Sequence, residues 1–390
     1  MIDRPRLDPL DLIGVDALLT DEERQIRDLA REWIRDRILP EVDDWYERAE
    51  IPARELAKEL GGMGFFGMQL PGEGYLGGVA YGLVELELEA GDSGLRSFVS
   101  VQSALTMFAI HAYGSDEQKA EWLPRLSSGE AIGCFGLTEA DSGSDPGSMR
   151  TSARRDGEDW ILNGTKFWIT NGSVSDVAVV WAQTDEGIRG FVVPSDSPGF
   201  SAPDIHKKLS LRASVTSELV FDEIRLPAGA VLPGIVGLKG PLSCLNEARY
   251  GIVWGVMGAA RACFESAIDY AKERVQFGKP IAAFQLTQKK LADMALELNK
   301  GTLLAYHLGR MKEAGTLRFQ QVSVGKLNNT REALKIARTA RGIHGANGIT
   351  LEYPIMRHMT NLESVITYEG TEEVHTLVIG EALTGHRAFA

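Results

Sequence analysis

Hydrophobic positions in the first third of the chain, from about residue 19 to residue 128, recur with the period of an α-helix. Thr20, with Glu23 three positions later, has the pattern of a capping box and predicts the start of one helix. Ser115 is expected to cap another helix over residues 116–126. The first part of the chain is therefore predicted to be helical.

Between about residues 131 and 233 the pattern changes to short segments that are rich in β-branched and aromatic residues. Residues 159–162 and 165–170 flank Asn163-Gly164, and Asn-Gly is a preferred two-residue hairpin turn. We therefore expect these two segments to pair as a β-hairpin. The middle of the chain is predicted to form a sheet.

Helical periodicity returns after residue 238, in long stretches over residues 259–274, 285–313 and 319–342. No internal repeat, low-complexity segment or long linker interrupts the chain. The order of helices, strands and helices predicts an α+β protein.

Composition and charge limit the classes of partner. The chain has 390 residues, of which 44% are hydrophobic and 24% charged, as in an ordinary globular protein with room for two or three domains. A net charge of −13 argues against nucleic acid as a general partner, although a few local arginines suffice for an anionic ligand. The three cysteines form no CxxC pair, so we expect neither a disulfide framework nor a structural metal site.

The N-terminal segment bears on localisation. Residues 1–21 lack a basic stretch followed by an apolar core, and they carry several acidic residues, unlike a secretory signal or a transit peptide. No apolar stretch approaches the roughly 18 residues that a membrane span requires. We therefore expect a soluble, cytoplasmic protein that has no membrane partner.

The sequence Tyr368-Glu369-Gly370-Thr371 places a carboxylate directly before a glycine, ahead of a helix predicted over residues 372–383. The missing side chain of Gly370 lets a ligand approach closely, which suits a positioned catalytic base. An ordinary helix start, with Thr371 as cap and acidic residues in the first turn, accounts for the same letters. These residues alone leave both interpretations open.

Four further motifs carry groups that suit a cofactor, and ordinary structural roles account for the same residues. Residues 135–145 leave a strand and form a loop of small hydroxyl and glycine residues, which suits a phosphate or a surface turn. Trp168 and Thr170 are expected on one face of a strand, unless Trp168 belongs to the core. Arg274, beside a helix break, suits a phosphate or a helix C-terminus. The glycine-rich residues 342–348 are weak evidence by themselves.

Taken together, these motifs resemble the acyl-CoA dehydrogenase family of flavoenzymes along essentially the whole chain. FGLTE with SGSD, then FWIT about 30 residues later, RVQFGKP, HGANG and YEGT occur in the order of that family. The subfamily of glutaryl-CoA dehydrogenases is the most similar at residues 91–97, 134–145, 246–251 and 361–371.

The resemblance implies a fold and an oligomer. We expect an N-terminal helical domain over residues 1–132, a β-barrel-like middle domain over residues 133–235 and a C-terminal four-helix bundle over residues 236–390. In the family a neighbouring subunit completes the FAD pyrophosphate site, which implies a homotetramer.

The resemblance also implies FAD as cofactor, with Trp168 packed against the flavin ring and the hydroxyl of Thr170 near its hydride-accepting atom. The residues that it assigns to FAD are Phe135, Gly136, Leu137, Thr138, Ser144, Trp168, Ile169, Thr170, Arg274, Phe277, Gln285, Gly342, Ile343, His344, Gly345, Ala346 and Thr371.

Glu369 matches the family base that removes the α-proton of the thioester. That chemistry requires a carboxylate shielded from bulk water, because burial raises its pKa. Some relatives carry the acid at the position of Ala248, which cannot accept a proton, so the family pattern leaves Glu369, with Glu247 as a competitor one residue away. The residues that the resemblance assigns to the acyl-CoA are Arg96, Ser97, Ser144, Leu242, Asn246, Arg249, Gly370 and Phe389.

Arg96 indicates the subfamily, because a guanidinium can bind the second carboxylate of a dicarboxylic thioester through two hydrogen bonds. Glu89 lies two helical turns earlier and is expected to orient Arg96, although an ordinary structural pair is the alternative. Leu95, Ile366 and Glu381 stand where the subfamily usually has tyrosine, asparagine and arginine, and they leave the acyl substrate open.

The expected activity is the oxidative decarboxylation of glutaryl-CoA to crotonyl-CoA and CO₂, as in lysine and tryptophan degradation, with electrons passing to electron-transferring flavoprotein. The alternatives are a dehydrogenase of another short-chain or branched acyl-CoA, a glutaryl-CoA dehydrogenase that does not decarboxylate, and an inactive scaffold. An acyl-CoA oxidase is not expected, since such oxidases usually carry an additional C-terminal domain.

Overall fold

The computed structural model describes residues 7–72 and 74–388. The helices are α1 (Asp21–Trp33), α2 (Val42–Arg48), α3 (Ala53–Gly62), α4 (Gly77–Gly91), α5 (Ser93–Ser100), α6 (Phe108–Tyr113), α7 (Asp116–Ser127), α8 (Lys239–Glu273), α9 (Gln285–Glu313), α10 (Phe319–His344), α11 (Ile355–Val365) and α12 (Glu372–Thr384). The strands are β1 (Gly133–Gly136), β2 (Ser152–Asp156), β3 (Asp159–Thr170), β4 (Val177–Thr184), β5 (Gly187–Pro194), β6 (Phe200–Ser201), β7 (Thr216–Leu226), β8 (Val275–Gln276) and β9 (Lys279–Pro280).

The chain divides into two compact units, each built from segments that are distant in sequence. The first unit comprises the described residues of Met1–Asp44, Gly78–Arg96 and Tyr250–Ala390, and the second those of Trp45–Gly77 and Ser97–Arg249. The boundaries predicted at residues 132/133 and 235/236 remain predictions. No helix in the described part of the chain is both long and apolar enough to cross a membrane.

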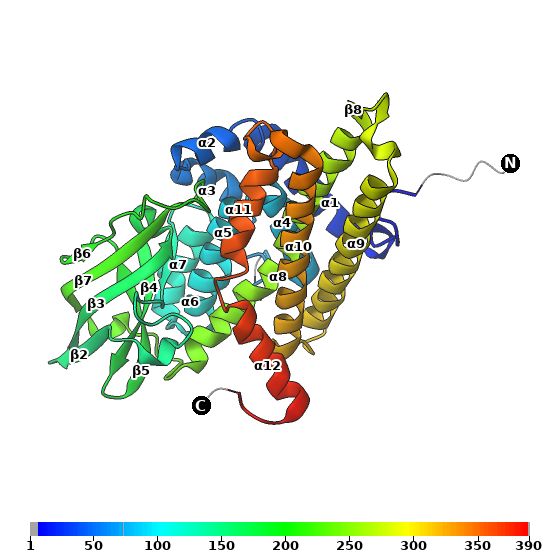
Figure 1. The fold of residues 1–390 in the computed structure, drawn as a ribbon. Helices are drawn as coiled ribbons and strands as arrows, with labels where there is room; N and C mark the ends of the chain where they lie inside the picture. The colour runs from blue at the N-terminus through cyan, green and yellow to red at the C-terminus, as the bar shows by residue number, and fades with distance from the viewer. Residues whose placement is uncertain (1–6, 73, 389–390) are drawn as a thin grey trace. The chain divides into compact units, whose positions relative to one another are not determined.

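Helices form most of the first unit. The long helices α9 and α10 lie side by side, and α11 and α12 pack against α10 (Figure 1). Helix α1 starts at the predicted capping box, in which the backbone amide of Glu23 donates to Thr20 Oγ1 at 3.2 Å and that of Thr20 donates to Glu23 Oε2 at 2.8 Å. Helix α9 has the predicted bounds. Helix α8 is longer than expected, because the apolar period already begins at its first turns.

Helix α4 approaches α8 closely because glycines replace side chains where the two meet. Gly251, Gly255 and Gly258 recur on one face of α8. A Cβ atom at Gly258 would collide with the carbonyl oxygen of Leu86, and one at Gly251 would lie 3.0 Å from Glu85 Oε2. The glycines therefore bring the polar groups of α4 against the backbone of α8.

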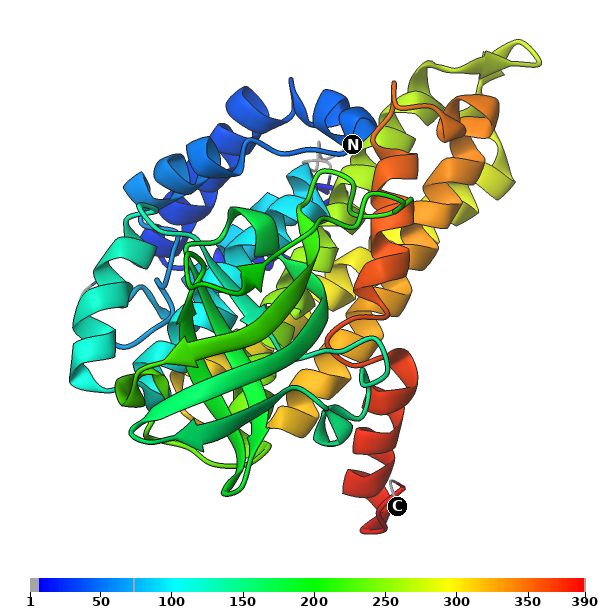
Figure 2. The same ribbon diagram turned by 90° about the vertical axis from the view of Figure 1, so that its left-hand side faces the viewer.

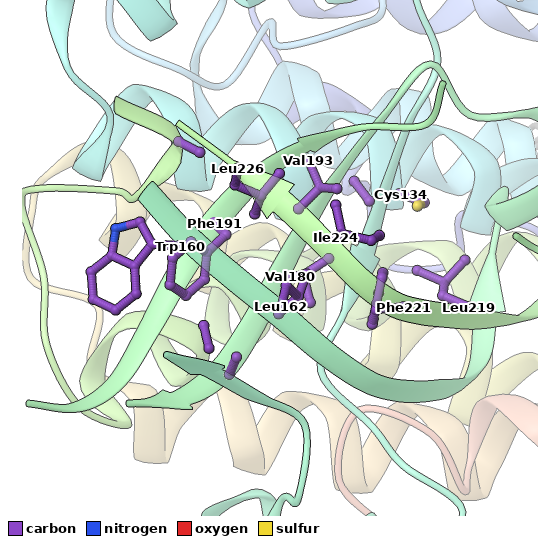
Figure 3. Packing of buried hydrophobic residues seen from close by; sticks show 14 of the residues in the cluster. Cys134, Trp160, Leu162, Val180, Phe191, Val193, Leu219, Phe221, Ile224 and Leu226 are labelled. Carbon is purple, nitrogen blue, oxygen red and sulfur yellow. The ribbon is translucent and has the colours of Figure 1, made fainter. Parts of the chain in front are cut away.

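The second unit contains a seven-stranded sheet that curls strongly (Figure 2). The strand order is β1-β4-β2-β3-β7-β6, with β5 paired to β4. Its core is a cluster of inward-facing apolar residues, in which the rings of Trp160 and Phe191 meet edge to face at 5.3 Å (Figure 3). The helical parts and the curled sheet in the middle confirm the predicted fold class.

Asn163-Gly164 does not form the predicted hairpin turn. Both residues lie within strand β3, and the turn that joins β2 to β3 is at residues 157–158. The register against β7 shifts between Leu162 and Gly164, and a Cβ at Gly164 would lie 2.6 Å from the Cα atom of Thr151. The glycine therefore serves a bulge and a close backbone approach rather than a turn.

A small hairpin follows α8, where the sequence indicates only a helix break. Strands β8 and β9 pair antiparallel, and the two residues between them, Phe277 and Gly278, both have positive φ angles of 52° and 78°. This backbone is that of a tight primed turn, to which Gly278 is suited. Phe277 at the tip is 94% exposed.

Candidate active site

Glu369 lies on a tight turn between α11 and α12. Glu369 and Gly370 both have positive φ angles, 52° and 97°, a conformation that glycine adopts readily and glutamate rarely does. Thr371 caps α12, since its hydroxyl accepts from the backbone amide of Val374 at 3.3 Å. Glu369 is half-buried and its Oε2 atom is shielded from solvent. The cap and the positioned acid, which the sequence presents as alternatives, are thus adjacent features of one turn.

Lys326, on α10, holds this turn through two hydrogen bonds. Its buried Nζ atom donates to the carbonyl oxygens of Tyr368 at 2.8 Å and Gly370 at 2.7 Å, the residues on either side of Glu369. An ammonium group can satisfy several carbonyls at once. Lys326 therefore fixes a backbone that Glu369 would not adopt by propensity. The sequence reasoning missed Lys326.

Arg96, at the end of the segment that α4 and α5 contribute to the first unit, is almost fully buried. Its Nε atom donates to Glu89 Oε2 at 2.8 Å, as the sequence predicts, and its Nη2 atom donates to the hydroxyl of Tyr368. Burial alone would lower the pKa of Arg96, but Tyr368 and the neighbouring carboxylates raise it, so the guanidinium stays charged. A buried cation thus lies beside the residue that precedes the candidate base.

The three departures from the subfamily pattern lie in different surroundings. Leu95 is buried in the helix that carries Arg96, and Ile366 ends α11. Glu381, on α12, forms an ion pair with Arg387 at 3.7 Å. Glu381 therefore has a basic partner of its own near the end of the chain.

In the second unit, a buried ion pair supports the loop that follows β1. Lys166 Nζ on β3 donates to the carbonyl oxygen of Leu137 and to Glu139 Oε1, both at 2.9 Å. Burial alone would raise the pKa of Glu139, but hydrogen bonds from Arg150, Thr151 and Lys166 lower it to about 2. Burial lowers the pKa of Lys166 to about 8, against the effect of Glu139. Both groups are charged at neutral pH.

Trp168 is a surface residue, so the core alternative is wrong. Its side chain is 56% exposed and its φ angle is 62°. The register of β3 against β7 shifts between Lys166 and Ile169, and this bulge interrupts the simple alternation expected for Trp168 and Thr170. The neighbouring Phe167 contacts the indole edge to face at 5.0 Å, and its amide donates to the carbonyl oxygen of Thr138 at 2.8 Å. An aromatic face is thus presented beside the loop after β1.

Several predicted cofactor residues of the first unit meet in one surface hollow. Arg274 and residues 343–347, at the end of α10 and just after it, line it together, although they are about 70 positions apart in the sequence. His344 stacks on Tyr270 with ring centroids 4.4 Å apart and accepts or donates at the Ser266 hydroxyl, 3.1 Å away. Burial lowers the pKa of His344. The lining residues are Tyr270, Arg274, Gln276, Ile281, Ile343, His344, Gly345, Ala346 and Asn347.

The hollow combines a cation with a sharp turn of the backbone. Arg274 supplies a guanidinium, and Gly345, with a φ angle of 60°, turns the backbone directly after α10. Phe277, Gln285 and Gly342 are not among the residues that line it. Tyr270 and Asn347 were missed, although Tyr270 lies only four residues before the arginine of the RVQFGKP motif.

The remaining predicted contacts with the acyl-CoA lie in the second unit or outside the described residues. Arg249 Nη1 donates to Asn246 Oδ1 at 3.2 Å within α8, and Leu242 is partly exposed on the same helix. Ala248 is fully buried, Ser97 is buried and Ser144 is exposed in the loop after β1. Phe389 lies outside the described residues.

The helical parts, the curled sheet and the acid on a turn before a capped helix define an acyl-CoA dehydrogenase. Family models of the acyl-CoA dehydrogenase N-terminal, middle and C-terminal domains match residues 20–130, 134–224 and 236–384, respectively. The chain therefore belongs to the acyl-CoA dehydrogenase family.

Individual members of the family differ in how similar they are to this chain. The crystal structure of glutaryl-CoA dehydrogenase from Mycobacterium smegmatis is 65% identical, with a TM-score of 0.97 over 99% of this chain and 100% of that one. A glutaryl-CoA dehydrogenase from the same organism in complex with FADH2 is 61% identical, with the same TM-score and coverage. The human mitochondrial short-chain specific acyl-CoA dehydrogenase is 36% identical over 87% of this chain and 84% of that protein. The two proteins from Mycobacterium smegmatis are thus more similar to this chain than the human short-chain enzyme is.

Proposed function

We propose that the protein is an FAD-dependent dehydrogenase that oxidises and decarboxylates glutaryl-CoA to crotonyl-CoA. The observation that carries the proposal is the buried, charged Arg96, which is bonded to Tyr368, the residue before Glu369. A purely hydrocarbon acyl chain gains nothing from a buried cation, whereas a second carboxylate binds it through charge-assisted hydrogen bonds. The 65% identity to a glutaryl-CoA dehydrogenase supports the same substrate.

Glu369 is the base in this proposal. Its carboxylate takes the α-proton of the thioester, while the β-hydrogen leaves as hydride, for which bound FAD would supply the acceptor. The product, a glutaconyl thioester, then loses its distal carboxylate as CO₂, and the bonding electrons move into the conjugated thioester. Protonated Glu369 returns its proton to the resulting dienolate, which gives crotonyl-CoA. One carboxyl group thus acts first as base and then as acid.

The residues present fit FAD in two respects. The exposed indole of Trp168 and the adjacent backbone of the loop after β1 suit a planar ring system, and the hollow around Arg274 suits phosphates. We assign to the cofactor the residues from Phe135 to Thr138, Ser144, the Trp168–Thr170 segment, Arg274, Phe277, Gln285, the Gly342–Ala346 segment and Thr371. The CoA ester is assigned to Arg96, Ser97, Ser144, Leu242, Asn246, Arg249 and Gly370.

The test compares the reduction of bound flavin by glutaryl-CoA with that by butyryl-CoA and isovaleryl-CoA, followed by mass spectrometry of the products. Faster reduction by glutaryl-CoA with crotonyl-CoA as product is expected. Glutaconyl-CoA as the only product would limit the reaction to dehydrogenation. A preference for butyryl-CoA or isovaleryl-CoA would make the protein a short-chain or branched-chain enzyme, and bound flavin that no ester bleaches would indicate a scaffold.

Two features of the assembly belong to the same proposal. We infer a homotetramer in which Arg274 and the Gly342–Ala346 segment reach the FAD of another subunit, and electron-transferring flavoprotein as the acceptor in the cytoplasm. The isolated protein is therefore expected to be yellow and to lose FAD when diluted to monomers. A monomer that retains FAD tightly, measured by sedimentation and flavin fluorescence, would contradict the shared site.

A further inference from the structure

A second acid, Glu85, lies in the same polar cluster as Arg96. Tyr81, Glu85 and Glu89 are spaced by four residues on α4 and therefore occupy one face of that helix. Glu85 is 0% exposed, and the backbone of α8 at Gly251 packs against it and against the Tyr81 hydroxyl. A Cβ atom at Gly251 would lie 3.0 Å from Glu85 Oε2 and 3.3 Å from that hydroxyl. The carboxyl group is thus enclosed between two helices.

Glu85 forms a much longer ion pair with Arg96 than Glu89 does. Its Oε2 atom lies 4.0 Å from Arg96 Nε, at the limit of an ion pair, whereas Glu89 Oε2 lies 2.8 Å from the same nitrogen. Glu89 is held there by the Ser93 hydroxyl at 2.9 Å. Among the described residues, neither oxygen of Glu85 has a hydrogen bond of normal geometry, although the Tyr81 hydroxyl lies beside it.

The charges of the cluster do not allow Glu85 to be ionised together with its neighbours. Arg96 supplies one positive charge, which Glu89 already neutralises, and Glu369 adds a further carboxyl group. A buried carboxylate without a close cationic partner is strongly unfavourable, so such a group takes up a proton. If the distal carboxylate of a substrate also approached Arg96, an ionised Glu85 would repel it.

We propose that Glu85 is a positioning residue that stays neutral in the acyl-CoA complex and thereby adds no further negative charge to compete with the distal carboxylate of the substrate for Arg96. This role rests on the function proposed above. Glu85 acts through Arg96 and the electrostatic field at the end of the acyl chain, not on the reacting carbons. It therefore decides whether a dicarboxylic ester is preferred over a monocarboxylic one.

The surroundings of Glu85 set the pH at which this preference is lost. The groups that act on it are Tyr81 and Glu89 from α4, Arg96 from α5 and Glu369 from the turn before α12. Tyr250 of α8 stacks on Tyr81, and the Tyr368 hydroxyl accepts from Arg96. Burial raises the pKa of Glu85, and the carboxyl groups of Glu89 and Glu369 add to this effect. Arg96 and Tyr81 lower the pKa, and the result is a pKa of about 8. The carboxyl is neutral below that pH and gains a negative charge above it.

The experiment measures kcat and KM for glutaryl-CoA and butyryl-CoA across the pH range with the FAD-loaded enzyme. The ratio of the two kcat/KM values cancels effects common to both esters, such as the ionisation of Glu369. In the wild type we expect this ratio to fall about tenfold or more between about pH 7 and about pH 9.5, as one charge-assisted contact is cancelled. The fall should lie in KM for glutaryl-CoA, because the contact is equally strong in the ground and transition states.

Glu85→Gln keeps the shape of the acid and cannot ionise, so its ratio should stay level over the same range. The matched control is Glu265→Gln, which neutralises another carboxyl whose pKa burial raises, on α8 and paired with Arg261. It should retain the wild-type fall. The wild-type profile needs no variant, so the proposal stays testable even if Glu85→Gln does not fold.

Two results would overturn the inference while the proposed function stands: a glutaryl-CoA preference in the wild type that does not change with pH, or the same fall in Glu85→Gln as in the wild type. A wild type without any preference for glutaryl-CoA at neutral pH would instead refute the proposed function, and with it this inference. Arg96→Met tests the proposed function separately from the role of Glu85. In this variant the ratio of kcat/KM for glutaryl-CoA to that for butyryl-CoA should be low at every pH.

Discussion

The two units of the molecule hold their functional groups in different ways. In the first unit, Arg96 is surrounded by the side chains of Glu85, Glu89 and Tyr368. The turn that carries Glu369 is held by hydrogen bonds from Lys326. In the second unit, the bonds that hold the loop after β1 have a backbone amide or carbonyl at one end or at both, and the Glu139 and Lys166 side chains provide several of the other ends.

This difference predicts different responses to substitution. Side chains in a buried network interact strongly through a low dielectric, so that one replacement changes the charge felt by all the others. A backbone-held loop keeps its path when a single side chain is exchanged, and the change appears mainly in stability. Substitutions in the first unit should therefore change the reaction rate and the choice of substrate. Substitutions in the second unit should mainly change the stability of the loop after β1.

The largest effect is expected from Glu369→Gln. The amide keeps the shape of the turn but cannot accept the α-proton, so flavin reduction by glutaryl-CoA should fall by roughly 10² to 10⁴ or more, while FAD and CoA ester still bind. Anaerobic stopped-flow spectroscopy measures it, with Glu373→Gln, an exposed acid in the first turn of α12, as control. Near-normal flavin reduction in this variant would show that another residue is the base, and Glu247 would be the first candidate.

Arg96→Met should have the next largest effect, and a selective one. Loss of a charge-assisted partner costs roughly 1.5–3 kcal/mol, so kcat/KM for glutaryl-CoA should fall about 10- to 150-fold, and that for butyryl-CoA much less. Arg96→Lys keeps the charge but not the planar fork and should recover part of the loss. An equal loss on both esters would reduce Arg96 to a structural role.

Lys326→Met tests whether the turn depends on its support. The carbonyl oxygens of Tyr368 and Gly370 would lose their donor, and the Glu369 carboxylate would no longer be held at one place. We expect kcat to fall by about tenfold for both esters alike, because a small displacement of a catalytic group is costly. Lys335→Met, on the exposed side of α10, is the control. An unchanged kcat would show that the turn holds its own geometry.

The smallest effect on flavin reduction is expected from Glu139→Gln, whose effect lies in stability. The pKa of Glu139 is about 2, below its ordinary value of 4.5, so its contribution is present above about pH 4.5 and is lost as the pH falls towards 2. The variant should lose roughly 2–3 kcal/mol at neutral pH, and the difference from the wild type should shrink on acidification. Urea unfolding at several pH values measures this, and a difference that does not depend on pH would contradict it.

Much of the helical framework follows from the sequence, since local patterns specify it. Helix α9 has the predicted bounds, and Thr20 and Ser115 cap the predicted helices, because capping hydrogen bonds and the 3.6-residue period are local properties. The YEGT motif locates the turn before α12 for the same reason. By contrast, Asn163-Gly164 is a turn by local propensity, but pairing with β7 and the close approach of Thr151 make it a bulge within β3.

The sequence by itself determined the order of helices and strands, the family motifs and the identity of Arg96 and Glu369 as the residues of interest. Only the tertiary structure decided which polar groups surround them. Glu85 and Lys326 come from helices that are far apart in the sequence, and nothing in their local patterns distinguishes them from other charged residues. Their burial next to Arg96 and to the turn of Glu369 results from helix packing, which long-range contacts determine and a linear pattern does not record.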